Sequence, residues 1–270
     1  MIPDQTPMSD TSDSAPAAVA PCAVPAMIRL LGLDFANLDV TTAAAWIAAR
    51  PAEVPFRYVV NPNADHLTHI SRDPALAEVY RGALLRLMDS RVVVGMARLL
   101  GLPHPPVVHG TDLTPELLRR HLRPGEKVTI IGLRPELLPA LQERCGPMEI
   151  AHHYPPMGFD RDPAAFRAAV EFVVANPARF IFLGVGMPRQ ERLAAAIQAS
   201  GRACGTGLCI GSALEFVAGA QRRAPLWMQH VGLEWLHRLS QEPRRLARRY
   251  LVQCPPALVL LLNERLHRRA

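Results

Sequence analysis

The chain has 270 residues, of which 49% are apolar and 20% charged, and it is long enough for one large or two modest domains. Its net charge of +6 rests on arginine, because Lys127 is the only lysine, and arginines crowd beyond Arg222. This excess favours an anionic partner such as a phosphate, an acidic lipid surface or a nucleic acid. The five cysteines show neither metal-site spacing nor an even secreted framework, so we expect a reducing cytosol.

Residues 1–26 are rich in Pro, Ala, Ser and Asp and have no hydrophobic periodicity. They lack the basic and apolar regions of a signal peptide, so we expect a disordered tail. No window reaches the roughly 18 to 20 apolar residues that span a bilayer, and Ala257–Leu262 is far too short. We therefore expect membrane contact, if any, to be peripheral.

From Ile28 onward, runs typical of buried strands alternate with helical patterns. The expected strands are Ile28–Leu33, Phe56–Val60, Val92–Val94 (a strand or turn edge), Lys127–Gly132, Met148–His152, Phe180–Leu183 and Ala203–Ile210. The expected helices are Thr42–Arg50 capped by Thr41 or Thr42, one from about Asp65, Pro74–Leu87, Met96–Leu100, Thr114–His121 capped by Thr114, Pro135–Cys145, Pro163–Asn176 and Gln190–Ser200. This alternation predicts an α/β, Rossmann-like domain with a mostly parallel sheet flanked by helices.

The stretch Phe180–Arg192, FIFLGVGMPRQER, predicts a buried strand, a tight turn and the start of a helix. Gly184 and Gly186 allow the backbone to bend and to approach a ligand closely. Pro188 suits a first helical turn, whose free N–H groups favour an anion such as a diphosphate. A turn with a purely structural role is an equal alternative, because Gly-x-Gly after a strand is common.

The segment beyond Ala218 interleaves arginine with tryptophan and leucine. Its arginines include Arg222, Arg223, Arg238, Arg244, Arg245, Arg248 and Arg249. Such clustering suits a diphosphate, which the planar guanidinium can bind through two hydrogen bonds, or an anionic membrane. A solvated basic helix packed on the sheet is the plainer alternative. We expect residues 27–219 to form the main domain and residues 220–270 a helical, Arg-rich C-terminal appendage.

Several motifs together resemble the WecG/TagA/CpsF glycosyltransferase family over about Met27–Leu251. They are VVNPNADHL, MDSRVVVGMARLLG, HGTDL, GVGMPRQE, AGAQRRAPLW, GLEWLHRL and EPRRLARRY, in this order and spacing. The resemblance implies an inverting transferase that moves an N-acetylhexosamine, such as N-acetylmannosamine or its uronic acid, from a UDP-sugar to a polyprenyl-diphosphate-linked acceptor. The expected setting is surface polysaccharide or exopolysaccharide synthesis at the inner face of the cytoplasmic membrane, with no metal or other cofactor. A homo-oligomer is compatible with all of this.

The resemblance also assigns site residues. Asp89 would be the catalytic base that deprotonates the acceptor hydroxyl. The donor and its nucleotide would contact Asn61, Asn63, Thr111, Asp112, Gly184, Gly186, Gln190 and Glu191. The diphosphate and acceptor would contact Arg223, Arg238, Arg245 and Arg248. For the short polar residues the alternative is turn chemistry or helix capping, and for Glu191 it is a favourable position in a helix dipole.

The chain departs from the family pattern at three positions. Asn61 stands where the family often has Thr, Ser90 where it usually has Gly, and Glu215 where it usually has Asp. The adjacent His152 and His153 would point to opposite faces of a strand, which argues against a zinc site.

Two other function classes compete with this interpretation. An NAD-dependent oxidoreductase would explain the glycine turn, but the turn lacks a third glycine and an acidic residue about 20 positions on. A nucleic-acid-binding protein would explain the basic end, although its arginines alternate with tryptophan and leucine rather than forming a run.

Overall fold

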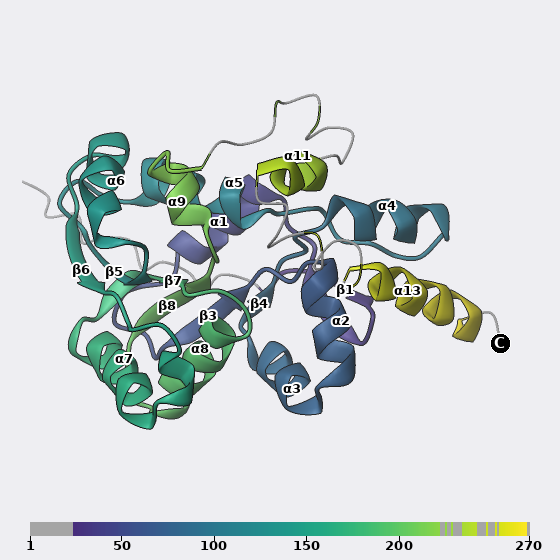
Figure 1. Cartoon of the computed structure of the whole chain (residues 1–270), viewed down its shortest axis with the longest axis horizontal. Helices are drawn as coiled ribbons and strands as arrows, with labels where there is room; N and C mark the ends of the chain where they lie inside the picture. The colour runs from purple at the N-terminus through teal and green to yellow at the C-terminus, as the bar shows by residue number, and fades with distance from the viewer. Residues whose placement is uncertain are drawn as a thin grey trace, which may run out of the picture.

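The computed structural model describes residues 24–221, 225, 228, 234–241, 247, 252 and 254–268. Its central element is a six-stranded parallel sheet in the order β4-β3-β8-β7-β5-β6 (Figure 1). These strands are β3 (Arg57–Val60), β4 (Leu85–Arg86), β5 (Lys127–Gly132), β6 (Glu149–His153), β7 (Ala178–Gly184) and β8 (Gly205–Cys209). The parallel α/β sheet confirms the predicted Rossmann-like architecture.

Helices cover both faces of the sheet. One face carries α2 (Ala64–Arg72), α3 (Pro74–Gly82), α4 (Arg91–Leu99), α7 (Pro163–Ala175), α8 (Arg189–Ala199) and α13 (Pro255–His267). The other carries α1 (Val40–Ala48), α5 (Gly110–Glu116), the π-helix η1 (Leu117–His121), α6 (Leu138–Cys145) and α9 (Ala213–Val217). The short 3₁₀ turns η2 (Pro135–Leu137) and η3 (Phe159–Arg161) precede α6 and α7, and α11 spans Glu234–Gln241.

Alternating side chains of each strand divide the core between these two layers. On β7, Ile181 and Leu183 pack under α7 and α8, whereas Phe180 and Phe182 face the opposite layer. All four are fully buried. The period of two is what a strand with helices on both sides requires, and it explains why the run reads as continuously apolar.

The first predicted strand, Ile28–Leu33, is wrong as a single element. It is a hairpin of β1 (Met27–Leu30) and β2 (Leu33–Ala36), paired antiparallel with Leu30 opposite Leu33. The turn between them contains Leu31 and Gly32, both with positive φ, of which Gly32 adopts this conformation without strain.

Four other predictions about the elements need correction. Val92–Val94 is not a strand but part of α4, and the helix predicted over Pro74–Leu87 ends at Gly82 before β4. The helix predicted to begin at Thr114 begins at Gly110, so Thr114 is buried within it rather than capping it. Helix α1 is capped by Asp39 in a reciprocal capping box with Thr42, not by a threonine.

Candidate functional site

The candidate site lies at the edge of the sheet where the parallel strands end. Ligands of open α/β sheets bind in the crevice outside the carboxyl ends of the strands. Outside α5 and the C-terminal segment, the predicted site residues lie in the loops after β3 and β4, at the end of β7 and in the turn that follows it, and in the first turn of α8. One half of the site is formed by the loops after β3 and β4 and the start of α5, and the other half by the glycine turns.

Asp89, in the loop between β4 and α4, is fixed by its backbone between two neighbouring loops. Its N–H donates to the Pro62 carbonyl at 2.9 Å, and the preceding residue, Met88, accepts from the Val108 N–H at 2.8 Å. These bonds join the loops after β3 and β4 to the start of α5. Residues far apart in the sequence therefore meet around one carboxylate.

The Asp89 side chain is oriented by two groups of the α5 terminus. Its Oδ1 pairs with His109 Nδ1, and its Oδ2 accepts from the Gly110 N–H at 3.3 Å. The side chain keeps 26% of its surface exposed. An oriented carboxylate that still reaches solvent is able to accept a proton from a substrate hydroxyl, as a general base must.

His109 is a residue that the sequence motif contained but whose role it did not reveal. It directly precedes α5, in a different loop from Asp89, and its ring orients the Asp89 carboxylate. The 20-residue separation between Asp89 and His109 gave no signal of the contact. Only a search for a His close to the predicted catalytic carboxylate would have identified His109.

The departure at Ser90 does not distort this loop. Ser90 caps α4 by accepting from the Val93 N–H at 3.2 Å, and its φ of −156° is extended backbone that any residue adopts. Serine is a favoured N-cap residue. The substitution of the family's glycine therefore gives α4 a cap without requiring an unusual backbone.

The two asparagines after β3 are both engaged within the protein. Buried Asn61 donates from Nδ2 to the Val108 carbonyl at 3.1 Å, which ties the β3 loop to the α5 loop. Asn63 caps α2 by accepting from the N–H groups of Asp65 and His66. The capping alternative is thus confirmed for Asn63, and donor binding by either amide stays a prediction.

Thr111 and Asp112 lie in the first turn of α5, directly after Gly110. The alternative interpretation, in which they cap a helix that begins after Thr114, is therefore wrong. They directly follow His109 and Gly110, the two residues that contact the Asp89 carboxylate. Contact with donor hydroxyls stays a prediction for both.

The turns after β5, β7 and β8 form the second half of the site and pack closely because they contain glycine. A Cβ on Gly132 would lie 2.8 Å from the Gly184 carbonyl oxygen, and a Cβ on Gly184 would lie 3.1 Å from the Gly211 oxygen. Gly186 has a φ of +77°, which favours glycine. The predicted tight turn after β7 is confirmed, and its anion contact stays a prediction.

The two halves of the site meet at Gly110. A Cβ at that position would lie 3.5 Å from the Ile210 carbonyl oxygen, in the loop after β8, and 4.0 Å from Asp89 Oδ2. The start of α5 therefore lies between the carboxylate and the glycine turns. This arrangement brings Asp89 and the predicted nucleotide turn to the same edge of the sheet.

Gln190 and Glu191 are buried beneath the turns. Gln190 Oε1 accepts from the Gly211 N–H at 3.0 Å, and its Nε2 donates to Glu191 Oε1 at 2.9 Å. Glu191 is 0% exposed, and burial raises its pKa to about 7. The pair holds the loop after β8 in place, and its predicted contact with a nucleotide is untested.

Arg189 is a second residue that sequence reasoning left unassigned. It begins α8, and its Nη2 lies 3.5 Å from where a Cβ of Gly186 would be. A guanidinium over the turn is suited to a diphosphate group. Its place inside GVGMPRQER was a signal that could have identified it.

The arginines predicted to bind the diphosphate are not placed by the structure. Arg223, Arg245 and Arg248 lie outside the described residues, and Arg238 falls in α11 with a side chain that is not described. Their predicted roles therefore stay predictions.

Within the described part of the chain, no group of three or more His, Cys, Asp or Glu residues is arranged to hold a metal ion. His152 Nε2 lies 2.8 Å from the Gly132 carbonyl oxygen, whereas His153 stacks on Phe172 of α7. The two rings thus point away from each other, as predicted for neighbours on a strand.

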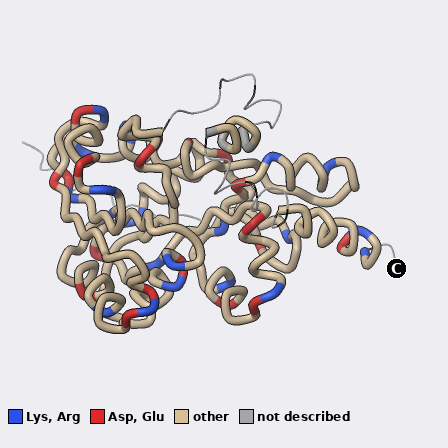
Figure 2. The backbone as a smooth tube through the Cα atoms, viewed as in Figure 1, with Lys and Arg blue, Asp and Glu red and all other residues tan. Residues whose placement is uncertain are grey.

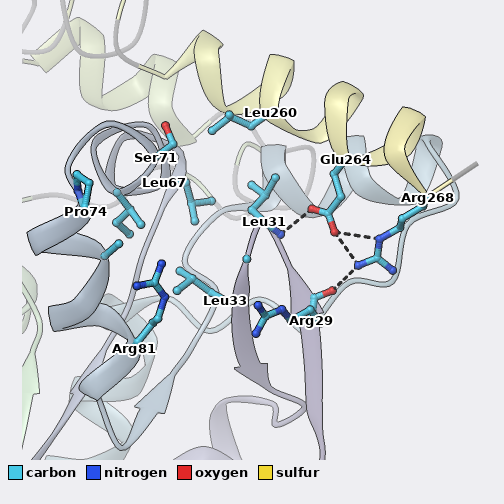
Figure 3. A pocket seen from close by; sticks show the side chains of 13 residues that line it. Arg29, Leu31, Leu33, Leu67, Ser71, Pro74, Arg81, Leu260, Glu264 and Arg268 are labelled. Atoms are coloured by element: carbon cyan, nitrogen blue, oxygen red, sulfur yellow. Dashed lines mark hydrogen bonds and ion pairs between the residues drawn. The ribbon is translucent and has the colours of Figure 1, made fainter. Parts of the chain in front are cut away.

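A separate cavity of about 630 Å³ lies between the β1–β2 hairpin, α2, α3 and α13 (Figure 3). Its lining includes Leu33, Leu67 and Leu260, with Arg81 and Glu264 at its margin. None of the predicted site residues whose side chains the structure describes lines it, so it is distinct from the site at the sheet edge.

Comparison with known proteins matches residues 28–270 to the profile described as "Glycosyl transferase WecG/TagA/CpsF family". Similar curated proteins include the N-acetylglucosaminyldiphosphoundecaprenol N-acetyl-beta-D-mannosaminyltransferase of Staphylococcus aureus strain MW2. It is 24% identical over 229 residues, which cover 83% of this chain and 88% of the relative. The protein of the same name from strain MRSA252 is 25% identical over 231 residues, with the same two coverages.

Proposed function

The chain belongs to the WecG/TagA/CpsF glycosyltransferase family, and from this premise we propose that it transfers an N-acetylhexosamine from a UDP-sugar to a polyprenyl-diphosphate-linked sugar. The names of the Staphylococcus aureus relatives support the acceptor class and the choice of N-acetylmannosamine as the transferred sugar. Family membership also favours a glycosyltransferase over the oxidoreductase and nucleic-acid-binding alternatives.

The observation that carries the proposal is the position of Asp89. Its carboxylate is oriented by His109 and Gly110 and stays partly exposed at the carboxyl edge of the sheet. The turn at Gly184–Gly186, with Arg189 beside it, lies at the same edge and supplies the region for a diphosphate. A base and an anion site at one edge are the two parts that the reaction requires.

In the proposed reaction, the acceptor hydroxyl oxygen attacks the anomeric carbon of the donor sugar. Asp89 takes the hydroxyl proton as the new C–O bond forms. The bond from the anomeric carbon to the diphosphate oxygen breaks, and UDP leaves with the electron pair. A single displacement inverts the anomeric configuration, and cationic groups stabilise the departing charge.

The lipid-linked acceptor implies that the enzyme works at a membrane surface, and we place it peripherally at the cytoplasmic face. No described helix is both long and apolar enough to cross a bilayer. The arginines of the C-terminal segment, Arg223, Arg238, Arg245 and Arg248, stay the proposed contacts of the diphosphate and acceptor. No metal enters the proposed mechanism.

The test is UDP release from a panel of UDP-N-acetylhexosamines with an N-acetylglucosaminyl-diphospho-polyprenol acceptor. Asp89→Asn should lower turnover by about 10² to 10⁴-fold, the usual contribution of a general base, while UDP binding measured by titration is unchanged. Asparagine retains the shape of the side chain and a carbonyl oxygen for the Gly110 N–H. The loss would therefore report the missing base.

Asp73→Asn is the matched control. Asp73 caps α3 and pairs with Arg192 at 3.3 Å, and it lies at the end of α2 opposite to Asn63. Asparagine also caps helices, so this variant should keep wild-type turnover. Full activity of Asp89→Asn would refute the base, and absence of UDP release with every donor would refute the proposed reaction.

A further inference from the structure

Helix α4 exposes an apolar stripe beside its arginines. Val93, Val94 and Ala97 are buried in the core, as expected for an amphipathic helix. On the opposite side, Val92 and Leu99 are exposed at a spacing of seven residues, which places them on one face. Leu99 is 83% exposed, so among the residues that the structure describes none covers this end of the stripe.

Helix α13 repeats the pattern beside α4. It buries Ala257 and Leu261, yet Val259, Leu262 and Leu266 are exposed at positions i, i+3 and i+7. The two helices contact each other and lie side by side at the end of the molecule opposite to β6 (Figure 1). Together their exposed residues form what we call the α4–α13 surface, made of Val92, Leu99, Val259, Leu262 and Leu266.

The orientation of α13 is fixed by polar contacts on its other side. Glu264 Oε2 accepts from the Leu31 N–H at 2.6 Å, and Arg268 Nη2 donates to the Arg29 carbonyl at 3.0 Å (Figure 3). Arg268 also pairs with Glu264. These bonds tie the helix to the β1–β2 hairpin, so the exposed stripe is a feature of the fold.

The charge on these two helices is predominantly positive. Arg91 and Arg98 lie on α4, and Glu264 and Arg265 on α13. Arg268, directly after α13, pairs with Glu264. On α4, Figure 2 shows basic positions and no acidic ones. Exposed aliphatic side chains flanked by arginine are the pattern of a surface that lies in the interfacial layer of an anionic membrane.

We propose that the α4–α13 surface docks on an anionic lipid bilayer. The aliphatic side chains enter the boundary between headgroups and acyl chains, and the arginines meet lipid phosphates. Because Ser90 caps α4, Asp89 lies directly at the N-terminus of a docked helix. The proposal rests on the proposed function for the identity of the acceptor, and it explains how the base reaches the depth of a lipid-linked diphosphate.

Sedimentation with vesicles tests the surface directly, using the full chain without donor or acceptor. Wild-type protein should bind vesicles of phosphatidylcholine and phosphatidylglycerol in equal amounts more tightly than vesicles of phosphatidylcholine alone. The double variant Leu99→Ser/Leu262→Ser should bind the mixed vesicles at least about tenfold more weakly, because it loses buried methylene and methyl groups. Met157→Ser is the matched control, since Met157 is 93% exposed near the other end of the sheet, and it should bind as wild type.

A second variant tests the charge separately. Arg91→Gln/Arg98→Gln should weaken binding to the mixed vesicles by about tenfold and leave binding to phosphatidylcholine unchanged. The difference should shrink as salt is added. Both double variants should transfer sugar to a short-chain, water-soluble acceptor at the wild-type rate, and more slowly to an acceptor embedded in vesicles.

Unchanged vesicle binding by the leucine variant would overturn the proposal. A second result would also overturn it: ultracentrifugation without lipid shows a wild-type dimer, and the leucine variant is a monomer. The surface would then bind a second copy of this chain. Vesicle binding that follows the predictions while no protein releases UDP would support the surface and refute the proposed function, so the two failures are distinguishable.

Discussion

At the scale of single residues, Glu191 supports the candidate site from the interior of the protein. Its carboxyl accepts from Gln190, whose oxygen in turn accepts from the Gly211 N–H in the loop after β8. The groups that interact with it include Tyr80 of α3, whose hydroxyl lies 3.0 Å from His66 Nδ1, and Cys209 of β8. Burial raises the pKa of Glu191 from its ordinary 4.5 to about 7. The folded protein therefore binds this proton more tightly than the unfolded chain does.

This linkage predicts the pH dependence of a Glu191→Gln variant. The protonated carboxyl favours the native state below about pH 4.5, and that contribution is lost as the pH rises through about 7. Relative to Glu191→Gln, wild-type stability should fall across this window by at most about 1.4 kcal/mol per pH unit. Urea unfolding of both proteins between pH 4.5 and pH 8 measures the difference.

Glu171→Gln provides the comparison for an exposed carboxylate. Glu171 pairs with Arg202 on the surface, and the hydrogen bond from Arg202 lowers its pKa. A surface pair of this kind contributes little to stability, so the variant should follow wild type above pH 5. A stability difference between wild type and Glu191→Gln that does not change with pH would contradict the linkage.

Elements with a strong local pattern were predictable from sequence, and those that depend on distant packing were not. The strand Lys127–Gly132 was predicted with its observed bounds, since its apolar run is flanked by clear breaks. Val92–Val94 was predicted as a strand or turn edge, and β-branched residues do favour strands. The segment is nevertheless helical, because a helix packs Val93 and Val94 in the core. Likewise, no local signal shows that β8 inserts between β3 and β7.

The same limit applies to the site. Asp89, Asn63 and the glycine turn were identified by resemblance and by their position after strands. The partners of Asp89, His109 and Gly110, come from a loop that reaches it only in the folded chain. The sequence therefore predicts candidate residues for the chemistry, but not the contacts that orient them.

Gly132 at the end of β5 shows how one glycine controls the packing of two elements. Its φ is +94°, and an added Cβ would lie 2.8 Å from the Gly184 carbonyl oxygen. Gly132→Ala should therefore lower the free energy of unfolding by about 2–4 kcal/mol, through backbone strain and displacement of the β7 turn. Urea unfolding measures this loss, and UDP titration should show weaker binding because the turn moves.

The variant Gly125→Ala distinguishes the cost of backbone strain from the cost of contact between an added Cβ and Gly184. Gly125 has a φ of +74°, but nothing lies within 4 Å of an added Cβ. This variant should lose about 1–2 kcal/mol from the backbone alone and keep UDP binding. Equal losses in the two variants would show that contact with Gly184 does not matter.

At the scale of the whole molecule, α13 joins the C-terminal segment to the main core. Ala257 and Leu261 are fully buried in the cluster that contains residues of α2, α3 and α4. Deletion of all residues after Gly219 would therefore remove core contacts together with the predicted diphosphate arginines. Substitution of individual arginines tests catalysis without this loss.

Leu261 and Leu262 are adjacent on α13 and differ in environment, which makes them a matched pair. Leu261 is 0% exposed, whereas Leu262 is 46% exposed on the α4–α13 surface. Leu261→Ala should lower the free energy of unfolding by about 2–4 kcal/mol, because it leaves a cavity between α13 and the core. Leu262→Ala should change it by less than about 1 kcal/mol.

Urea unfolding of the two variants measures how firmly the C-terminal helix belongs to the fold. If Leu261→Ala unfolds in one cooperative transition at a lower urea concentration, α13 unfolds together with the sheet. A wild-type midpoint for Leu261→Ala would instead show that α13 detaches without cost to the main domain. In that case the α4–α13 surface would not be a fixed feature of the molecule, so this pair also tests the rigidity on which membrane docking depends.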